Sequence, residues 1–213
     1  QAQGEIWPGL RKLPWRVLCL EPIHSDYGGK NVKREAETSD HKAKRIADSA
    51  ATGLIWNSMN FEAAAKCMKC HGLARSEISG DAFAKMLEAG HPINPSFEIV
   101  MFSQGKMRHW RDKRSRAELS RLFVAGQAAK LVSATEAAAK TEDAKYKAAQ
   151  TKRAADAKAV LQAVPQAATL IQSPSDDNAR KMMQAIGQQD LTDQIGGLMK
   201  CAPADKENLW QCN

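Results

Sequence analysis

Residues 131 to 164 constrain the fold most, because they are rich in Ala, Lys, Glu, Asp, Thr and Gln and favour helix strongly. A helix continuous from Ser115 would be about 75 Å long, too long to lie on a small globule. We therefore expect it to protrude, to break near Gly126 or Ser133, or to join an assembly. A solvated helical spacer is the favoured interpretation, and close packing on a partner through small alanines is the alternative.

The rest of the chain also shows patterns typical of helices. Helices are indicated over 34–57, 61–69 and 82–89, and Ser115 to Glu118 has the S-x-x-E pattern of a capping box. Ser173 to Asp177 starts a further helix after Pro165, and no alternating strand pattern appears. The sequence therefore predicts an all-α protein in three parts. These are an irregular N-terminal arm (1–33), a central helical domain (34–130) and an Ala-rich helical C-terminal extension (131–213).

Composition excludes several classes of protein. Of the 213 residues, 43% are hydrophobic and 26% are charged, which argues against a collagen-like or wholly disordered chain. No apolar run reaches the roughly 18–20 residues that cross a bilayer, so we expect no transmembrane segment. The chain begins with Gln1, without an initiator Met or a signal-like segment. We therefore expect an exported or periplasmic product whose signal peptide has been removed.

The cysteines carry the chemistry. Cys67-Met68-Lys69-Cys70-His71 is C-x-x-C-H, the attachment sequence for c-type haem. On a helical turn both sulfurs face one way and can form thioethers with one haem, while the adjacent imidazole becomes the proximal iron ligand. A redox-active dithiol, which should open a helix after a strand, and a zinc knuckle, which needs two more ligands, are the alternatives.

The chain resembles class I c-type cytochromes over residues 40 to 130. The resemblance is carried by Cys67 to Gly72, by Gly105-Lys106-Met107, and by the capped helix that starts at Ser115. It departs from the family at Arg108, where proline is usual, and at Ala63, where an aromatic is usual. The resemblance implies a cytochrome c-like haem domain with one covalently attached haem c. It also implies one-electron transfer without catalysis by the chain alone.

Met107 is the favoured sixth iron ligand, because of its Gly-x-Met context before the capped helix. Met101, His91 and His109 are further candidates, and an open site is a remaining possibility. His/Met ligation raises the reduction potential relative to His/His ligation. The structural alternative for any methionine is a place in the core.

Charge and the chain's extra length predict partners. The formal net charge is +7, and residues 106 to 116 contain six basic side chains. Around an iron site these charges would steer an acidic redox partner protein, whereas the alternative is a solvated loop. Nucleic-acid binding is not expected, because Trp110 is the one aromatic nearby. The arm and the extension suggest a subunit of a larger hetero-oligomeric redox complex.

The remaining cysteines fit an oxidising compartment. Cys201 and Cys212 bracket a short turn and are expected to form a disulfide, while Cys19 is unassigned. The alternative function is a helical structural or assembly protein of the cell envelope, without haem, whose C-x-x-C is a disulfide.

Overall fold

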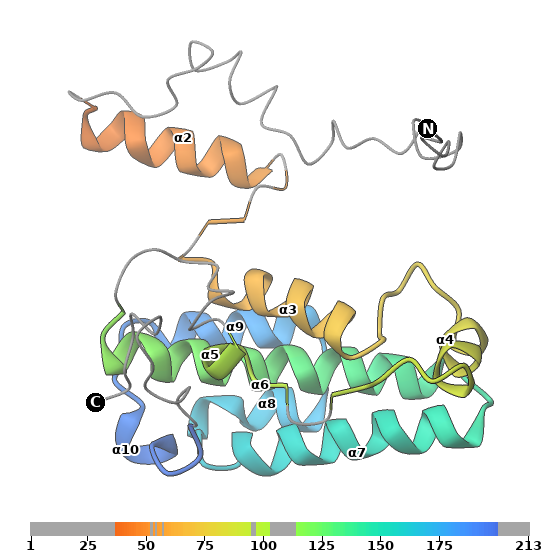
Figure 1. Cartoon of the computed structure of the whole chain (residues 1–213). Coiled ribbons are helices and arrows are strands. Elements are labelled where there is room, and N and C mark those ends of the chain that lie inside the picture. Colours follow the sequence, from red (N-terminus) through yellow and green to blue (C-terminus); the bar gives the residue numbers. More distant parts are fainter. Residues whose placement is uncertain are drawn as a thin grey trace, which may run out of the picture. The chain divides into compact units, whose positions relative to one another are not determined.

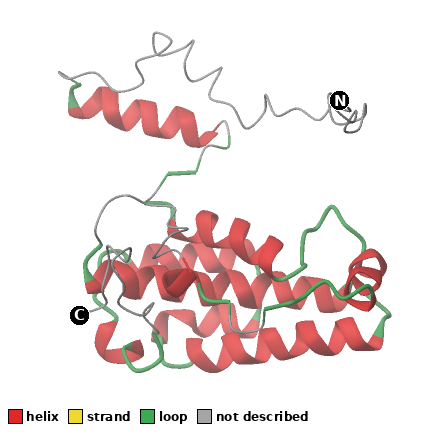
Figure 2. Ribbon diagram, viewed as in Figure 1, coloured by secondary structure: helices red, strands yellow, loops and turns green. Residues whose placement is uncertain are grey.

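The computed structural model describes residues 37–51, 53, 55–56, 58–94, 97–102 and 114–199. Over these ranges the chain consists of helices, turns and loops without a strand, which confirms the predicted all-α class (Figure 2). It divides into two compact units, Gln1–Trp56 and Asn57–Asn213, and each is described by itself. The predicted disulfide Cys201–Cys212, Cys19 and the arm 1–33 lie outside the described residues.

The described helices are named in chain order, with η4 a short 3₁₀ helix. They are α2 (Ser39–Ala51), α3 (Asn60–His71), α4 (Gly80–Glu88), α5 (Ile99–Phe102), α6 (Arg116–Ala139), α7 (Ala144–Leu161), η4 (Pro165–Ala167), α8 (Ala168–Gln172), α9 (Asp176–Ile186) and α10 (Thr192–Ile195) (Figure 1).

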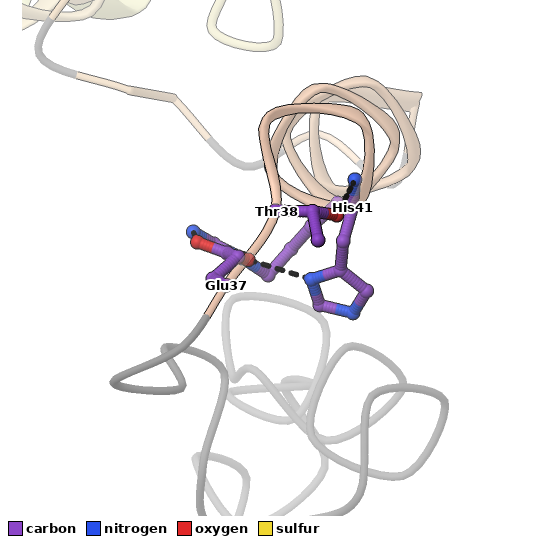
Figure 3. A network of polar contacts seen from close by, with 4 residues as sticks. Glu37, Thr38 and His41 are labelled. Carbon is purple, nitrogen blue, oxygen red and sulfur yellow. Dashed lines mark hydrogen bonds and ion pairs between the residues drawn. The ribbon is translucent and has the colours of Figure 1, made fainter.

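In the first unit, polar contacts organise the start of α2 (Figure 3). The Thr38 hydroxyl accepts from the His41 amide at 3.2 Å, and the Glu37 carboxylate lies 2.7 Å from His41 Nδ1. Arg45 donates to both Glu37 oxygens at 2.6 and 2.7 Å, and its guanidinium lies 5.4 Å from the Trp56 ring centre. The helix is shorter than the expected 34–57, because after Ala51 the chain enters a turn in which the Gly53 amide donates to Ala50 O.

The second unit is built around α6. The predicted capping box is confirmed: Ser115 Oγ accepts from the Glu118 amide, and the Glu118 side chain accepts from the Ser115 amide. Every residue from 119 to 134 is buried, so the helix is the centre of the core. Gly126 permits this packing, because a Cβ there would lie 2.7 Å from the Ile99 side chain of α5.

The Ala-rich region folds back instead of protruding. The helix that starts after Ser115 ends at Ala139, and α7 returns antiparallel to α6 after a short loop (Figure 1). Asp143 caps α7 by accepting from the Tyr146 amide at 2.6 Å. The expectation of a solvated spacer, and of a break near Gly126 or Ser133, was therefore wrong.

Small side chains allow α7 to pack closely against α6. Ala125 and Ala128 of α6 and Ala157 of α7 are fully buried, so the two helices pack against each other within the chain through small side chains. The predicted domain boundary between residues 130 and 131 falls inside α6, and the structure divides the chain after Trp56 instead. The other predicted boundary, between 33 and 34, lies outside the described residues.

Four further helices of the second unit, α3, α5, α9 and α10, pack against α6. Helix α3 packs along it, and α9 contacts both. Helix α9 starts within the predicted 173–177, where Ser175 caps it, and Met182 and Ile186 enter the core. Arg121 closes the far end of α9 by donating to Gln188 O and Gln189 O at 3.1 and 3.0 Å. Among the described residues, no helix combines the length and the apolar character that a bilayer crossing requires.

Candidate functional site

The C-x-x-C-H motif occupies the last turn of α3, which runs from Asn60 to His71. At 100° per residue, Cys67, Cys70 and His71 lie within about 100° of one another around the helix axis. Cys67 is half-buried against the core, whereas Cys70 and His71 are exposed. The two thiols and the imidazole therefore lie on one side of the helix, with Cys70 and His71 open to solvent and Cys67 partly covered by the core.

An aromatic ring fixes the imidazole. The rings of His71 and Phe97 are stacked, with centroids 3.9 Å apart and planes inclined by 7°. Phe97 is buried, and it precedes α5, which Glu98 caps by accepting from the amides of Val100 and Met101 at 2.7 and 2.9 Å. The face of the imidazole is thus packed on a side chain anchored in the core. This contact was not anticipated from the sequence.

The turn after the motif is held by helix α7. Tyr146, Gln150 and Arg153 recur at helical spacing and point one way, and we call these three residues the α7 clamp. The Tyr146 hydroxyl donates to Leu73 O. Gln150 Nε2 and Arg153 Nη1 donate to Gly72 O at 2.8 and 3.2 Å, and Arg153 Nη1 also donates to Gln150 Oε1 at 2.6 Å.

The glycine of the turn leaves room for the clamp. A Cβ on Gly72 would lie 2.1 Å from Arg153 Nη2 and 2.3 Å from its Cζ. Leu73, the next residue, has a positive φ of 49° and is 4% exposed. The chain leaving His71 is therefore fixed by close packing and by hydrogen bonds to its carbonyl groups.

Burial shifts the pKa values around the motif. Burial raises the pKa of the Cys67 thiol, and the neighbouring Cys70 raises it further. Burial lowers the pKa of Arg153 to about 10 and raises that of Glu98 to about 7. Burial and then Arg153 lower the pKa of Lys130, which is 7% exposed.

These properties separate the chemical alternatives. A redox-active dithiol gains its thiolate from the positive N-terminal end of a helix. Here the cysteines lie at the negative C-terminal end, and the Cys67 pKa is raised, so a nucleophilic thiolate is disfavoured. Among the described residues, no three His, Cys, Asp or Glu side chains gather as metal ligands, so the zinc alternative gains no support there. The donor set fits covalent haem attachment, which needs two thiols on one side of a helical turn and an adjacent imidazole.

Several predicted site residues are not placed. Met107 and His109 lie outside the described residues, as does most of the basic stretch 106–116. Met101 is half-buried in α5, and the exposed His91 is close to its own neighbour, with Nδ1 3.0 Å from Pro92 O. The structure therefore brings Cys67, Cys70 and His71 together and leaves the sixth-ligand prediction a prediction.

A separate cavity of about 630 Å³ lies at the opposite end of α3. Its lining includes Asn60, Glu62, Arg114 and Arg180. Arg114 donates to Asn60 Oδ1 at 3.2 Å, and Arg180 pairs with Glu62 at 3.2 Å. Because Cys67 and His71 do not line it, this cavity is not part of the motif.

Comparisons with known protein families, with curated proteins and with solved structures give no match to this chain.

Proposed function

We propose that this chain is a c-type cytochrome that carries one haem, joined by thioethers to Cys67 and Cys70 and ligated by His71. The observation that carries the proposal is the placement of these three side chains on one side of the last turn of α3, where Cys70 and His71 are exposed. The bound haem would supply a reversible one-electron change at iron. The chain would thus transfer electrons rather than catalyse a reaction alone.

The surrounding residues hold the ligand. Phe97 packs on the face of His71 and limits rotation of the imidazole. The α7 clamp holds the carbonyl groups of Gly72 and Leu73, so the backbone next to the ligand cannot shift without breaking buried hydrogen bonds. Such support orients a metal ligand and keeps its geometry constant between oxidation states.

We propose Met107 as the sixth ligand, on the basis of the Gly-x-Met resemblance. The test is the methionine-to-iron charge-transfer band at the red end of the visible spectrum. The band should be present in the oxidised protein and absent from Met107→Ala. A Met101→Ala variant is the matched control, and loss of the band there would move the assignment to Met101.

The proposed partner is an acidic redox protein, and the proposed setting is an exported or periplasmic hetero-oligomeric complex. The basic side chains of residues 106–116 favour electrostatic steering, which falls with ionic strength. The expected Cys201–Cys212 disulfide favours an oxidising compartment. Electron-transfer rates with an acidic partner should therefore fall as salt is added.

The central test is covalent haem. The full chain is expressed in a host with c-type haem maturation and examined by intact mass and by haem staining after denaturing electrophoresis. We expect one haem in the wild type, less in Cys67→Ala or Cys70→Ala, and none in the double variant. Cys19→Ala is the matched cysteine control and should keep the haem. Colourless protein whose two motif sulfurs are free, or joined to each other, would contradict the proposal and favour the envelope-protein alternative.

A further inference from the structure

A buried positive charge lies beside the C-x-x-C-H motif. Arg153 is 3% exposed, and its described hydrogen-bond partners are Gly72 O and Gln150 Oε1. Both are neutral groups, so none of these partners is a carboxylate. A buried guanidinium without an adjacent counter-ion is costly, and such a charge acts strongly on its surroundings.

The charge is close to the ligand end of α3. The guanidinium lies against Gly72, where an added Cβ would be 2.1 Å from Nη2. Gly72 follows His71 directly in the chain. Although burial lowers the pKa of Arg153, the group remains cationic at neutral pH.

Other charges near Arg153 do not cancel it. Lys130, also buried, is a second cation, and its charge interacts with Arg153 and Lys152 and with the carboxylates of Asp156 and Glu98. The Glu98 carboxylate is directed at the amides that start α5. Of the charged neighbours on α7, Lys152 is exposed and Asp156 is half-buried, and the two pair with each other at 2.8 Å. Among the described buried side chains beside the motif there are thus two cations, Arg153 and Lys130, and one carboxyl group, that of Glu98.

We propose that Arg153 is a positioning residue that also raises the reduction potential of the group held at His71, an inference that rests on the proposed function. Reduction adds one electron to that group, and a fixed positive charge nearby stabilises the added negative charge. Because Arg153 is shielded from water, the interaction is weakly screened by solvent and salt. Its fixed place on Gly72 gives it one position in both oxidation states.

The experiment compares midpoint potentials of the full-length holoprotein. Arg153→Met and Arg153→Gln remove the charge, Arg153→Lys keeps it, and Lys152→Met removes an exposed charge from the adjacent position of α7. We expect both neutral variants to favour the oxidised form at least tenfold relative to wild type, a shift of 59 mV to lower potential. The equilibrium ratio of oxidised to reduced protein should stay within threefold of wild type in Arg153→Lys and within twofold in Lys152→Met.

Each outcome has one meaning. Neutral variants that keep haem and the wild-type potential, or that shift no more than Lys152→Met, would overturn the inference. If the midpoint potential of Arg153→Lys falls as far as that of the neutral variants, the inference is overturned too, because the geometry of the arginine rather than its charge would then set the potential. Loss of folding in both neutral variants would assign Arg153 a purely structural role and overturn it. A wild-type chain whose mass shows no haem would instead refute the proposed function itself.

Discussion

The backbone of Gly72 lies against the guanidinium of Arg153 so closely that a Cβ at residue 72 would lie 2.1 Å from Nη2. The last glycine of the C-x-x-C-H-G sequence therefore has a packing role in this chain. Because Arg153 also donates to Gly72 O at 3.2 Å, the glycine fixes the guanidinium and the guanidinium fixes the turn. Gly72 and Arg153, far apart in the sequence, thereby hold each other in place at the end of α3.

Gly72→Ala should destabilise the second unit by about 1–3 kcal/mol, the usual cost of overpacking a buried site. The φ of Gly72 is −102°, which alanine adopts readily, so the loss reports the contact with Arg153 rather than backbone strain. The free energy of unfolding is measured by urea titration followed by circular dichroism. Gly197→Ala is the control, because a Cβ there meets nothing within 4 Å. Equal stability of the two variants would show that Arg153 moves aside without cost.

Glu98 should make the stability of the second unit pH-dependent around neutrality. Burial raises its pKa from 4.5 to about 7, so the folded state holds this proton more tightly than the unfolded state does. The stabilisation from this group is complete below pH 4.5 and is lost as pH rises through 7, a change of roughly 3 kcal/mol.

Glu98→Gln should remove this part of the pH dependence. The unfolding free energies of wild type and variant are compared from about pH 4 to about pH 9, a range that spans the folded and unfolded pKa values of Glu98. The difference between the two curves gives the contribution of residue 98 to the pH dependence. The exposed Glu88→Gln is the control and should keep the wild-type slope. A Glu98→Gln variant with the wild-type slope would place the titration on another group.

Local sequence signals predicted the helix starts well. The capping box at Ser115 is present and α9 starts within the predicted 173–177, because each signal depends on residues within one turn. The central place of α6 was missed, since residues 131–164, which include its last turns, were interpreted as a solvated helix, and the burial of α6 depends on where α7 returns. Asp143, which caps α7 after the break, is also a local capping signal, but the neighbouring polar residues make it hard to recognise in the sequence.

The site was predictable only where it is contiguous. Cys67, Cys70 and His71 form one local motif, and its position on a helical turn followed from the spacing. Phe97 and Arg153 reach the motif through tertiary packing, so no spacing rule pointed to them. Phe97 had one weak signal, an aromatic residue just before the apolar run of α5. Arg153 had none, since a charged residue in an Ala-rich and Lys-rich helix is ordinarily exposed.

Asp143→Ala should destabilise the second unit by about 1 kcal/mol, because the Tyr146 amide loses its acceptor at the start of α7. Tyr146 also belongs to the α7 clamp, so amide hydrogen exchange at Leu73 and Ala74 should accelerate together with that at the start of α7. Glu142→Ala, an exposed neighbour, is the control. Faster exchange in α7 alone would show that the clamp does not depend on the cap.

In the first unit, Arg45 should control the ionisation of Glu37. The hydrogen bonds from Arg45, and then from His41, hold the Glu37 pKa at about 2. Carbon-detected NMR titration of the Glu37 carboxyl group should give this low midpoint in the wild type, and Arg45→Gln should raise it toward the ordinary 4.5 of glutamate. Lys44→Gln is the matched control, because Lys44 pairs with Asp48 at 2.6 Å.

Since the pKa of Glu37 is lowered by folding, the contribution of Glu37 to the stability of α2 is present above pH 4.5 and is lost as pH falls toward 2. A Glu37 midpoint that Arg45→Gln leaves unchanged would mean that the hydrogen bonds between Arg45 and Glu37 are not maintained in solution.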